Sequence, residues 1–117
     1  MTQPVHITTI SQIITDRPIV LTENTWHTTI VDLYINLRQL LKDNFLALLS
    51  TPSDDFLVFD SNVLIIVKER TPEITKKILD IVDRINEKYR YEISINPLIT
   101  TGEDYVAHLF RRIVEKA

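Results

Sequence analysis

Two apolar runs joined by a polar connection constrain this chain most strongly. Residues 45–49 (FLALL) and residues 63–67 (VLIIV) are apolar throughout, and the second run is rich in β-branched side chains. Strands without a polar face need cover on both sides, so these runs predict interior strands of a sheet between helices. Between them, residues 56–59 are short and apolar, and they predict an abbreviated helix or an edge strand.

Helical patterns lie on either side of these strands. Residues 22–43 predict a helix that Thr22 or Asn24 can cap, and a second helix begins at Thr71-Pro72 with a threonine cap and proline in its first turn. The stripe predicted to be buried in the first helix is Trp26, Ile30, Leu33, Tyr34, Leu37, Leu40 and Leu41. The corresponding stripe in the second helix is Ile74, Ile78, Ile81, Val82, Ile85 and Tyr89.

The C-terminal third predicts one more strand and one more helix. Residues 91–95 alternate between apolar and polar, which predicts a half-exposed strand with Pro97 near its end. Thr101 and Asp104 resemble a capping box at the start of the last helix. That helix is predicted to bury Tyr105, Val106, Leu109, Phe110 and Ile113. The order predicts one α/β (α+β) domain over residues 1–117, with a small mixed sheet and helices packed on it. Residues 1–21 are interpreted as a short strand or irregular N-terminal arm.

Composition narrows the classes of function. The 117 residues carry a net charge of -3, which gives no electrostatic reason to expect nucleic acid as a partner. The absence of cysteine excludes disulfides and a thiolate nucleophile. No apolar run is long enough to cross a membrane, and the N-terminus lacks signal-peptide character, so we expect a cytoplasmic protein. A single glycine and many isoleucines are typical of a stiff, thermophilic protein.

The stretch from Leu48 to Ile66 carries a resemblance. Ser50-Thr51 follows the first strand, and Ser61-Asn62-Val63-Leu64 opens the second. This spacing resembles the minimal nucleotidyltransferases of the polymerase-beta-like superfamily, which have a Gly-Ser turn and a Ser-Asp-x-Asp segment at these places. Residues 95–99 and 104–116 are similar to the third strand and C-terminal helix of that family, so the resemblance spans residues 32–117. It implies a nucleotidyltransferase-like fold, in which the turn cradles a triphosphate and the two aspartates hold magnesium.

The chain departs from the family at the residues that carry this chemistry. Leu64 stands at the second aspartate and cannot ligate a hard cation, and Asn62 offers a neutral carbonyl at the first. Ser50 replaces the turn glycine. The basic residues usual in the turn give way to Pro52, Asp54 and Asp55, which would repel a triphosphate. The resemblance therefore implies a catalytically dead member with no catalytic residue, resident metal or cofactor.

Two functional hypotheses follow, and a third reading is an unrelated small α/β fold. The first is a non-catalytic module that retains the fold for binding, regulation or assembly with a protein partner or as a homo-oligomer. Its degenerate pocket would consist of Ser50, Thr51, Asp60, Asn62 and Glu92. The alternative is a nucleotidyltransferase that uses displaced carboxylates, Asp60 and Glu92, with magnesium and a nucleoside triphosphate. Against this alternative, Asp60 and Asn62 also fit an ordinary polar strand end. His6, His27 and His108 show no spacing typical of metal ligands.

Overall fold

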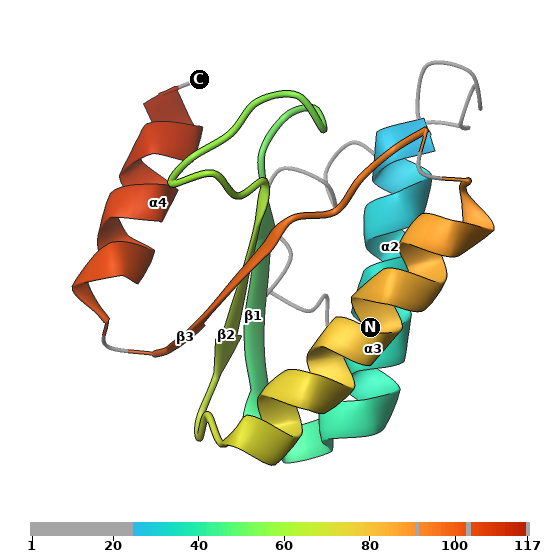
Figure 1. Ribbon diagram of the computed structural model, residues 1–117. Coiled ribbons are helices and arrows are strands. Elements are labelled where there is room, and N and C mark those ends of the chain that lie inside the picture. Colours follow the sequence, from blue (N-terminus) through green and yellow to red (C-terminus); the bar gives the residue numbers. More distant parts are fainter. Residues whose placement is uncertain (1–24, 91, 103, 117) are drawn as a thin grey trace, which may run out of the picture.

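Helices cover both faces of a small sheet in the computed structural model, which describes residues 25–90, 92–102 and 104–116 (Figure 1). The described elements are α2 (Thr25–Leu41), a short 3-10 turn (Lys42–Asn44), β1 (Phe45–Ser50), β2 (Val63–Val67), α3 (Pro72–Lys88), β3 (Pro97–Thr101) and α4 (Tyr105–Lys116). α2 and α3 pack on one face of the sheet and α4 packs on the other. The predicted N-terminal arm lies outside the described residues.

The sheet is mixed, as predicted. β2 lies in the centre, where it pairs antiparallel with β1 and parallel with β3. The predicted strand over residues 63–67 is confirmed, and the strand predicted over residues 45–49 extends by one residue to Ser50. Every residue of β2 is buried, because side chains on its two faces enter two different hydrophobic clusters. Residues 56–59 form neither a helix nor a named strand; Val58 makes an isolated bridge to Ser61.

The larger cluster lies between the sheet and the pair of helices α2 and α3. The predicted α3 stripe is confirmed, and its N-cap is confirmed by the Thr71 side chain, which accepts a hydrogen bond from the Ile74 N–H. Most of the predicted α2 stripe is buried, including Trp26 and Tyr34. Leu40 is the exception and is exposed, and the predicted caps of α2 lie outside the described residues.

The strand predicted over residues 91–95 is wrong, since β3 begins only at Pro97. The buried side chain of Asn86, on α3, explains the difference. Its amide oxygen accepts from the Ile95 N–H at 2.8 Å, and its amide nitrogen donates to the Ile95 carbonyl at 3.2 Å. The backbone of Ile95 is therefore satisfied by a helix side chain instead of a neighbouring strand. Alternation in this segment reflects the apolar packing of Ile93 and Ile95 against the α2–α3 side.

The last helix differs from its prediction in both its cap and its buried face. The carboxylate of Asp104 accepts from the Val106 N–H at 2.8 Å, so Asp104 caps the helix and Thr101 does not. Phe110 is buried as predicted, but Tyr105 and Ile113 are exposed. The buried stripe is instead Ala107, Phe110 and Val114, which places a small residue where the helix meets the sheet. No helix among the described residues is long and apolar enough to cross a membrane.

Replacing Asn86 tests its role in holding the segment before β3. Asn86→Ala removes both hydrogen bonds to Ile95 and leaves a buried N–H and C=O without partners, so we expect a loss of about 2–4 kcal/mol in the free energy of unfolding. Urea denaturation measures this loss. Asn36→Ala is the matched control, because Asn36 is half-buried and bonds only within α2. Equal stability of the two variants would contradict this role for Asn86.

Candidate functional site

The two motif positions of the resemblance lie side by side at one end of the sheet. Ser50 ends β1 opposite Val63, and the Thr51 N–H donates to the Asn62 carbonyl at 3.0 Å. The hydroxyl of Thr51 lies 3.2 Å from the same carbonyl. Ser50, Thr51 and Asn62 are all buried. The place where the family has its phosphate turn and first aspartate is therefore a closed junction of backbone and small polar side chains.

Asn62 is held on all sides by backbone groups. Its amide nitrogen donates to the carbonyls of Asp54 at 2.9 Å and Ser94 at 2.8 Å, and its amide oxygen accepts from the Asn96 N–H at 2.8 Å. The side chain thus joins the loop after β1, the start of β2 and the segment before β3. An aspartate here would press a negative charge against two carbonyl oxygens in a buried position. These surroundings therefore favour an asparagine over an aspartate.

Leu64 lies in the second hydrophobic cluster, beneath α4. It is fully buried in the same cluster as Phe110 and Val114. The position that the resemblance assigns to a second aspartate is consequently part of the apolar packing between α4 and the sheet. A carboxylate at this place would have neither solvent nor a polar partner from that cluster.

Thr51, in the turn after β1, also forms hydrogen bonds within the chain through its carbonyl and its hydroxyl. The indole N–H of Trp26 donates to the Thr51 carbonyl at 2.8 Å, and the Thr51 hydroxyl donates to the Ser53 carbonyl at 2.7 Å. Pro52 has no N–H to offer. The Ser50 hydroxyl is buried and has no hydrogen-bond partner among the described residues. This turn is therefore organised by bonds to its own chain, and the N–H of Thr51 is not available to a phosphate.

Asp60 and Glu92 lie on two different connections. Asp60 occupies a tight two-residue turn between Val58 and Ser61, whose backbones exchange hydrogen bonds at 2.7 and 2.9 Å, and its side chain is exposed. Glu92 is also exposed and follows α3, where its N–H donates to the Tyr89 carbonyl at 3.1 Å. The sequence predicts Glu92 on a strand beside β2; this prediction is wrong, because Glu92 lies in no strand. Within residues 25–90, 92–102 and 104–116, no three His, Cys, Asp or Glu side chains gather as a metal site.

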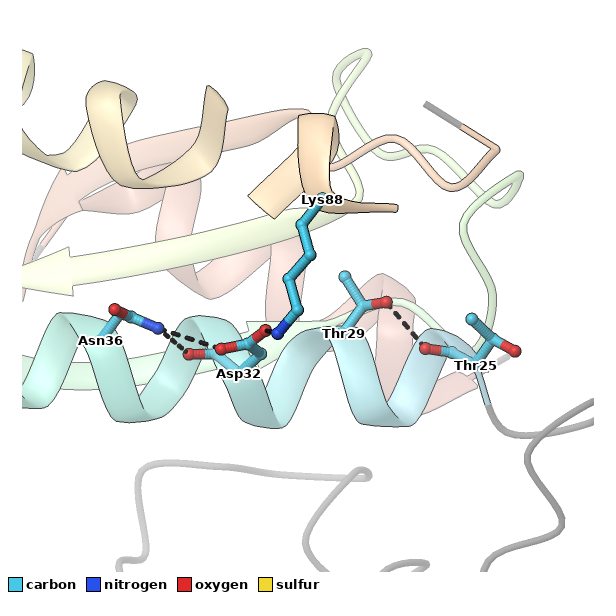
Figure 2. Close-up of polar contacts among 5 residues, drawn as sticks. All are labelled: Thr25, Thr29, Asp32, Asn36 and Lys88. Carbon is cyan, nitrogen blue, oxygen red and sulfur yellow. Dashed lines mark hydrogen bonds and ion pairs between the residues drawn. The ribbon is translucent and has the colours of Figure 1, made fainter. Parts of the chain in front are cut away.

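A polar contact between α2 and α3 was not anticipated from the sequence. The Lys88 ammonium lies 2.7 Å from the Asp32 carboxylate, which also accepts from the Asn36 amide at 3.0 Å (Figure 2). Beside it is a hollow of about 260 Å³ that Arg84 also lines. The hydrogen bond to Asp32 and the charge of that carboxylate raise the pKa of Lys88. The partners are 56 residues apart, so no local pattern marks them. The pair links α3 to α2. Asp32 neutralises the charge of Lys88, so we assign the pair a structural role.

Another hollow lies at the start of α3. It measures about 650 Å³ and includes Thr71, Thr75 and Leu79 in its lining. Arg70 lines it too, but its guanidinium donates to the Ile99 carbonyl at 2.6 Å and so is already bound to β3. None of the predicted site residues lines either hollow.

Charge at position 62 should destabilise the fold. Asn62→Asp places a carboxylate against two carbonyls, and we expect a loss of about 3 kcal/mol or more at pH 7. Burial raises the pKa of the new carboxyl above its unfolded value, so the loss should shrink as the pH falls towards that value. Urea unfolding at pH 7 and pH 5 measures both effects. Asn96→Asp, on an exposed neighbour, is the control; an equal loss there would contradict the explanation.

Removing the carboxylate of Asp32 should lower the pKa of Lys88. In Asp32→Asn the amide can still accept a hydrogen bond but carries no charge, so the pKa should fall towards 10.5. Because a raised lysine pKa stabilises the fold below the unfolded pKa, this stabilisation is lost as the pH rises through the folded pKa. An NMR titration of the lysine side chain measures the shift. Asp80→Asn, which removes the partner of Lys76, should leave the pKa of Lys88 unchanged.

Comparison of the chain with known proteins adds no assignment. It matches no family model, no curated protein and no solved structure. A functional assignment must therefore rest on the arrangement of its own residues.

Proposed function

We propose that this chain is a non-catalytic nucleotidyltransferase-like module that serves binding or assembly. The observation that carries the proposal is the state of Asn62, whose amide is fully engaged by backbone groups from three segments. Asn62 cannot turn towards a metal or a triphosphate without breaking its hydrogen bonds to two partly buried carbonyls and one N–H. Asn62 therefore has a structural role at the position where the resemblance implies a metal ligand.

Leu64 supports the same proposal from the other motif position. Its side chain is part of the packing between β2 and α4, so the cluster around it is apolar and closed. Phosphoryl or nucleotidyl transfer with two metal ions needs carboxylate oxygens converging on one site. At the place that the resemblance designates for them, the chain has one amide and one aliphatic side chain.

The alternative enzyme would depend on Asp60 and Glu92. Both side chains are exposed, and they lie on separate connections, one between β1 and β2 and the other after α3. No specific contact of the described residues brings them together, and nothing in their surroundings favours this second function. The non-catalytic module is therefore the function that the arrangement supports best.

Titration calorimetry with nucleotides tests the proposal. ATP and CTP, each with magnesium and then with manganese, should give no metal-dependent heat even at millimolar nucleotide, because the Asn62 amide and the Thr51 N–H are already bonded and Leu64 is apolar. The Asp60→Ala/Glu92→Ala double variant is the control and should give the same flat titration. Metal-dependent binding of micromolar strength that disappears in the double variant would overturn the proposal and favour the enzyme.

A further inference from the structure

Exposed apolar side chains occur on two neighbouring elements, the connection between β1 and β2 and the helix α4. Leu57 is 49% exposed and Phe59 is 52% exposed, both in the connection between β1 and β2. Tyr105 is 73% exposed and Ile113 is 41% exposed, both on α4. The connection passes beside α4 (Figure 1). Its residue Val58 shares a cluster with Phe110 and Val114 of that helix. Large apolar groups left in water on neighbouring elements are typical of an interaction surface.

The helix α4 carries two apolar stripes, and the chain buries only one of them. Ala107, Phe110 and Val114 face the sheet. Tyr105, Leu109 and Ile113 recur every four residues and form a second stripe, which we call the outer stripe. Leu109 is half-buried and the other two are exposed. A helix with one covered face normally shows polar residues on its outside, so the outer stripe calls for a partner.

The turn at residues 58–61 presents a phenylalanine where the backbone disfavours one. Phe59 has φ 55° and Asp60 has φ 61°, both in the left-handed region. Asparagine and glycine adopt this region readily, whereas a bulky side chain is strained there. The ring of Phe59 remains half exposed, so the chain by itself offers the side chain little burial in return. Strained backbone conformations of this kind cluster at functional sites, which makes Phe59 a candidate contact residue.

The two elements also carry opposite charge. Residues 51–61 contain Asp54, Asp55 and Asp60 and no lysine or arginine, and we call this stretch the acidic tip. The C-terminal half of α4 contains Arg111, Arg112 and Lys116 against one glutamate. The ion pairs among the described residues are Lys76–Asp80 and Lys88–Asp32, so none of these charges has an ion-pair partner within that part of the chain. An acidic apolar tip and a basic apolar helix are therefore complementary surfaces on one molecule.

We propose that this surface binds a second copy of the same chain in a two-fold symmetric dimer. The acidic tip of one protomer lies against the outer stripe and basic end of α4 in its partner, and the reverse contact forms at the same time. A two-fold axis produces such paired contacts, because each surface meets the other one twice. Both surfaces lie on the α4 side of the sheet, which allows the two contacts to belong to a single interface. The inference rests on the proposed function and names its partner.

Charge reversal tests the pairing of the two surfaces. Asp54→Lys/Asp55→Lys makes the tip basic, and Arg111→Glu/Arg112→Glu makes the helix acidic. Each variant alone should be monomeric at about 100 μM by sedimentation equilibrium, where the unaltered full chain is a dimer. An equimolar mixture should regain the dimer, because one contact then joins the two altered surfaces and the other joins the two unaltered ones, and the charges are opposite in both. Failure of the mixture to associate would overturn the proposal.

A second variant separates loss of association from loss of folding. Phe59→Asn removes the ring and relieves the left-handed backbone, so its thermal stability should equal or exceed that of the unaltered chain. Its dimer dissociation constant should nevertheless rise at least about tenfold. Leu79→Ser, on an exposed leucine of α3, is the matched control and should leave that constant unchanged. A dimer that survives Phe59→Asn, or an unaltered chain that is monomeric at this concentration, contradicts the inference.

The two proposals fail in different experiments. A monomeric chain that gives no heat with nucleotides would remove the dimer and leave the non-catalytic module standing. A dimer that binds nucleotide with metal would do the opposite.

Discussion

Burial of β2 on both faces is the constraint on which the rest of this structure depends. Five consecutive apolar residues leave no side of the central strand fit for water, so helices must cover the sheet from both directions. One face receives two long helices, α2 and α3, and the other receives the shorter α4. Leu64 is part of the packing between β2 and α4, which requires an apolar side chain at this position. In this chain the side chains at positions 62 and 64 are both used in holding the fold together.

Three asparagine side chains connect separate segments of the chain by hydrogen bonds to their backbones. Asn62 joins three segments at the start of β2, and Asn86 holds the backbone of Ile95 to α3. Asn44, at the end of the short turn after α2, exchanges two hydrogen bonds with the backbone of Glu69 at 2.9 and 3.1 Å. An amide can give and accept hydrogen bonds at once, so one side chain satisfies backbone that has no strand partner. The three asparagines thus connect segments that are separated in the sequence.

Elements marked by local signals could be predicted from the sequence. The apolar runs of β1 and β2 and the Thr71-Pro72 start of α3 identify themselves by composition and spacing alone. The segment before β3 could not be predicted in this way, because its alternation is that of a strand while its hydrogen bonds go to Asn86 on a helix. The face of α4 was ambiguous for a related reason. Its sequence contains two apolar stripes, and only the shape of the sheet selects Ala107 for the inner one.

The sequence predicts which residues of the candidate site are neighbours, but it does not predict their hydrogen bonds. The sequence places Ser50-Thr51 and Asn62 next to one another through the pairing of two recognisable strands. It does not reveal that the Asn62 amide would be consumed by Asp54, Ser94 and Asn96, since two of these partners lie more than 30 residues away. Glu92 was assigned to a strand that does not form, and its expected approach to β2 depended on that strand.

The outer edge of β3 affects the tendency of the protein to aggregate at high concentration. Open strand edges invite another strand, and repeated edge pairing leads to aggregation. In this sheet β3 starts with Pro97, which has no N–H, and the carbonyl of Ile99 is occupied by the guanidinium of Arg70. A fourth strand would find one donor missing and one acceptor taken along five residues. By occupying the Ile99 carbonyl, Arg70 disfavours the addition of another strand at this edge.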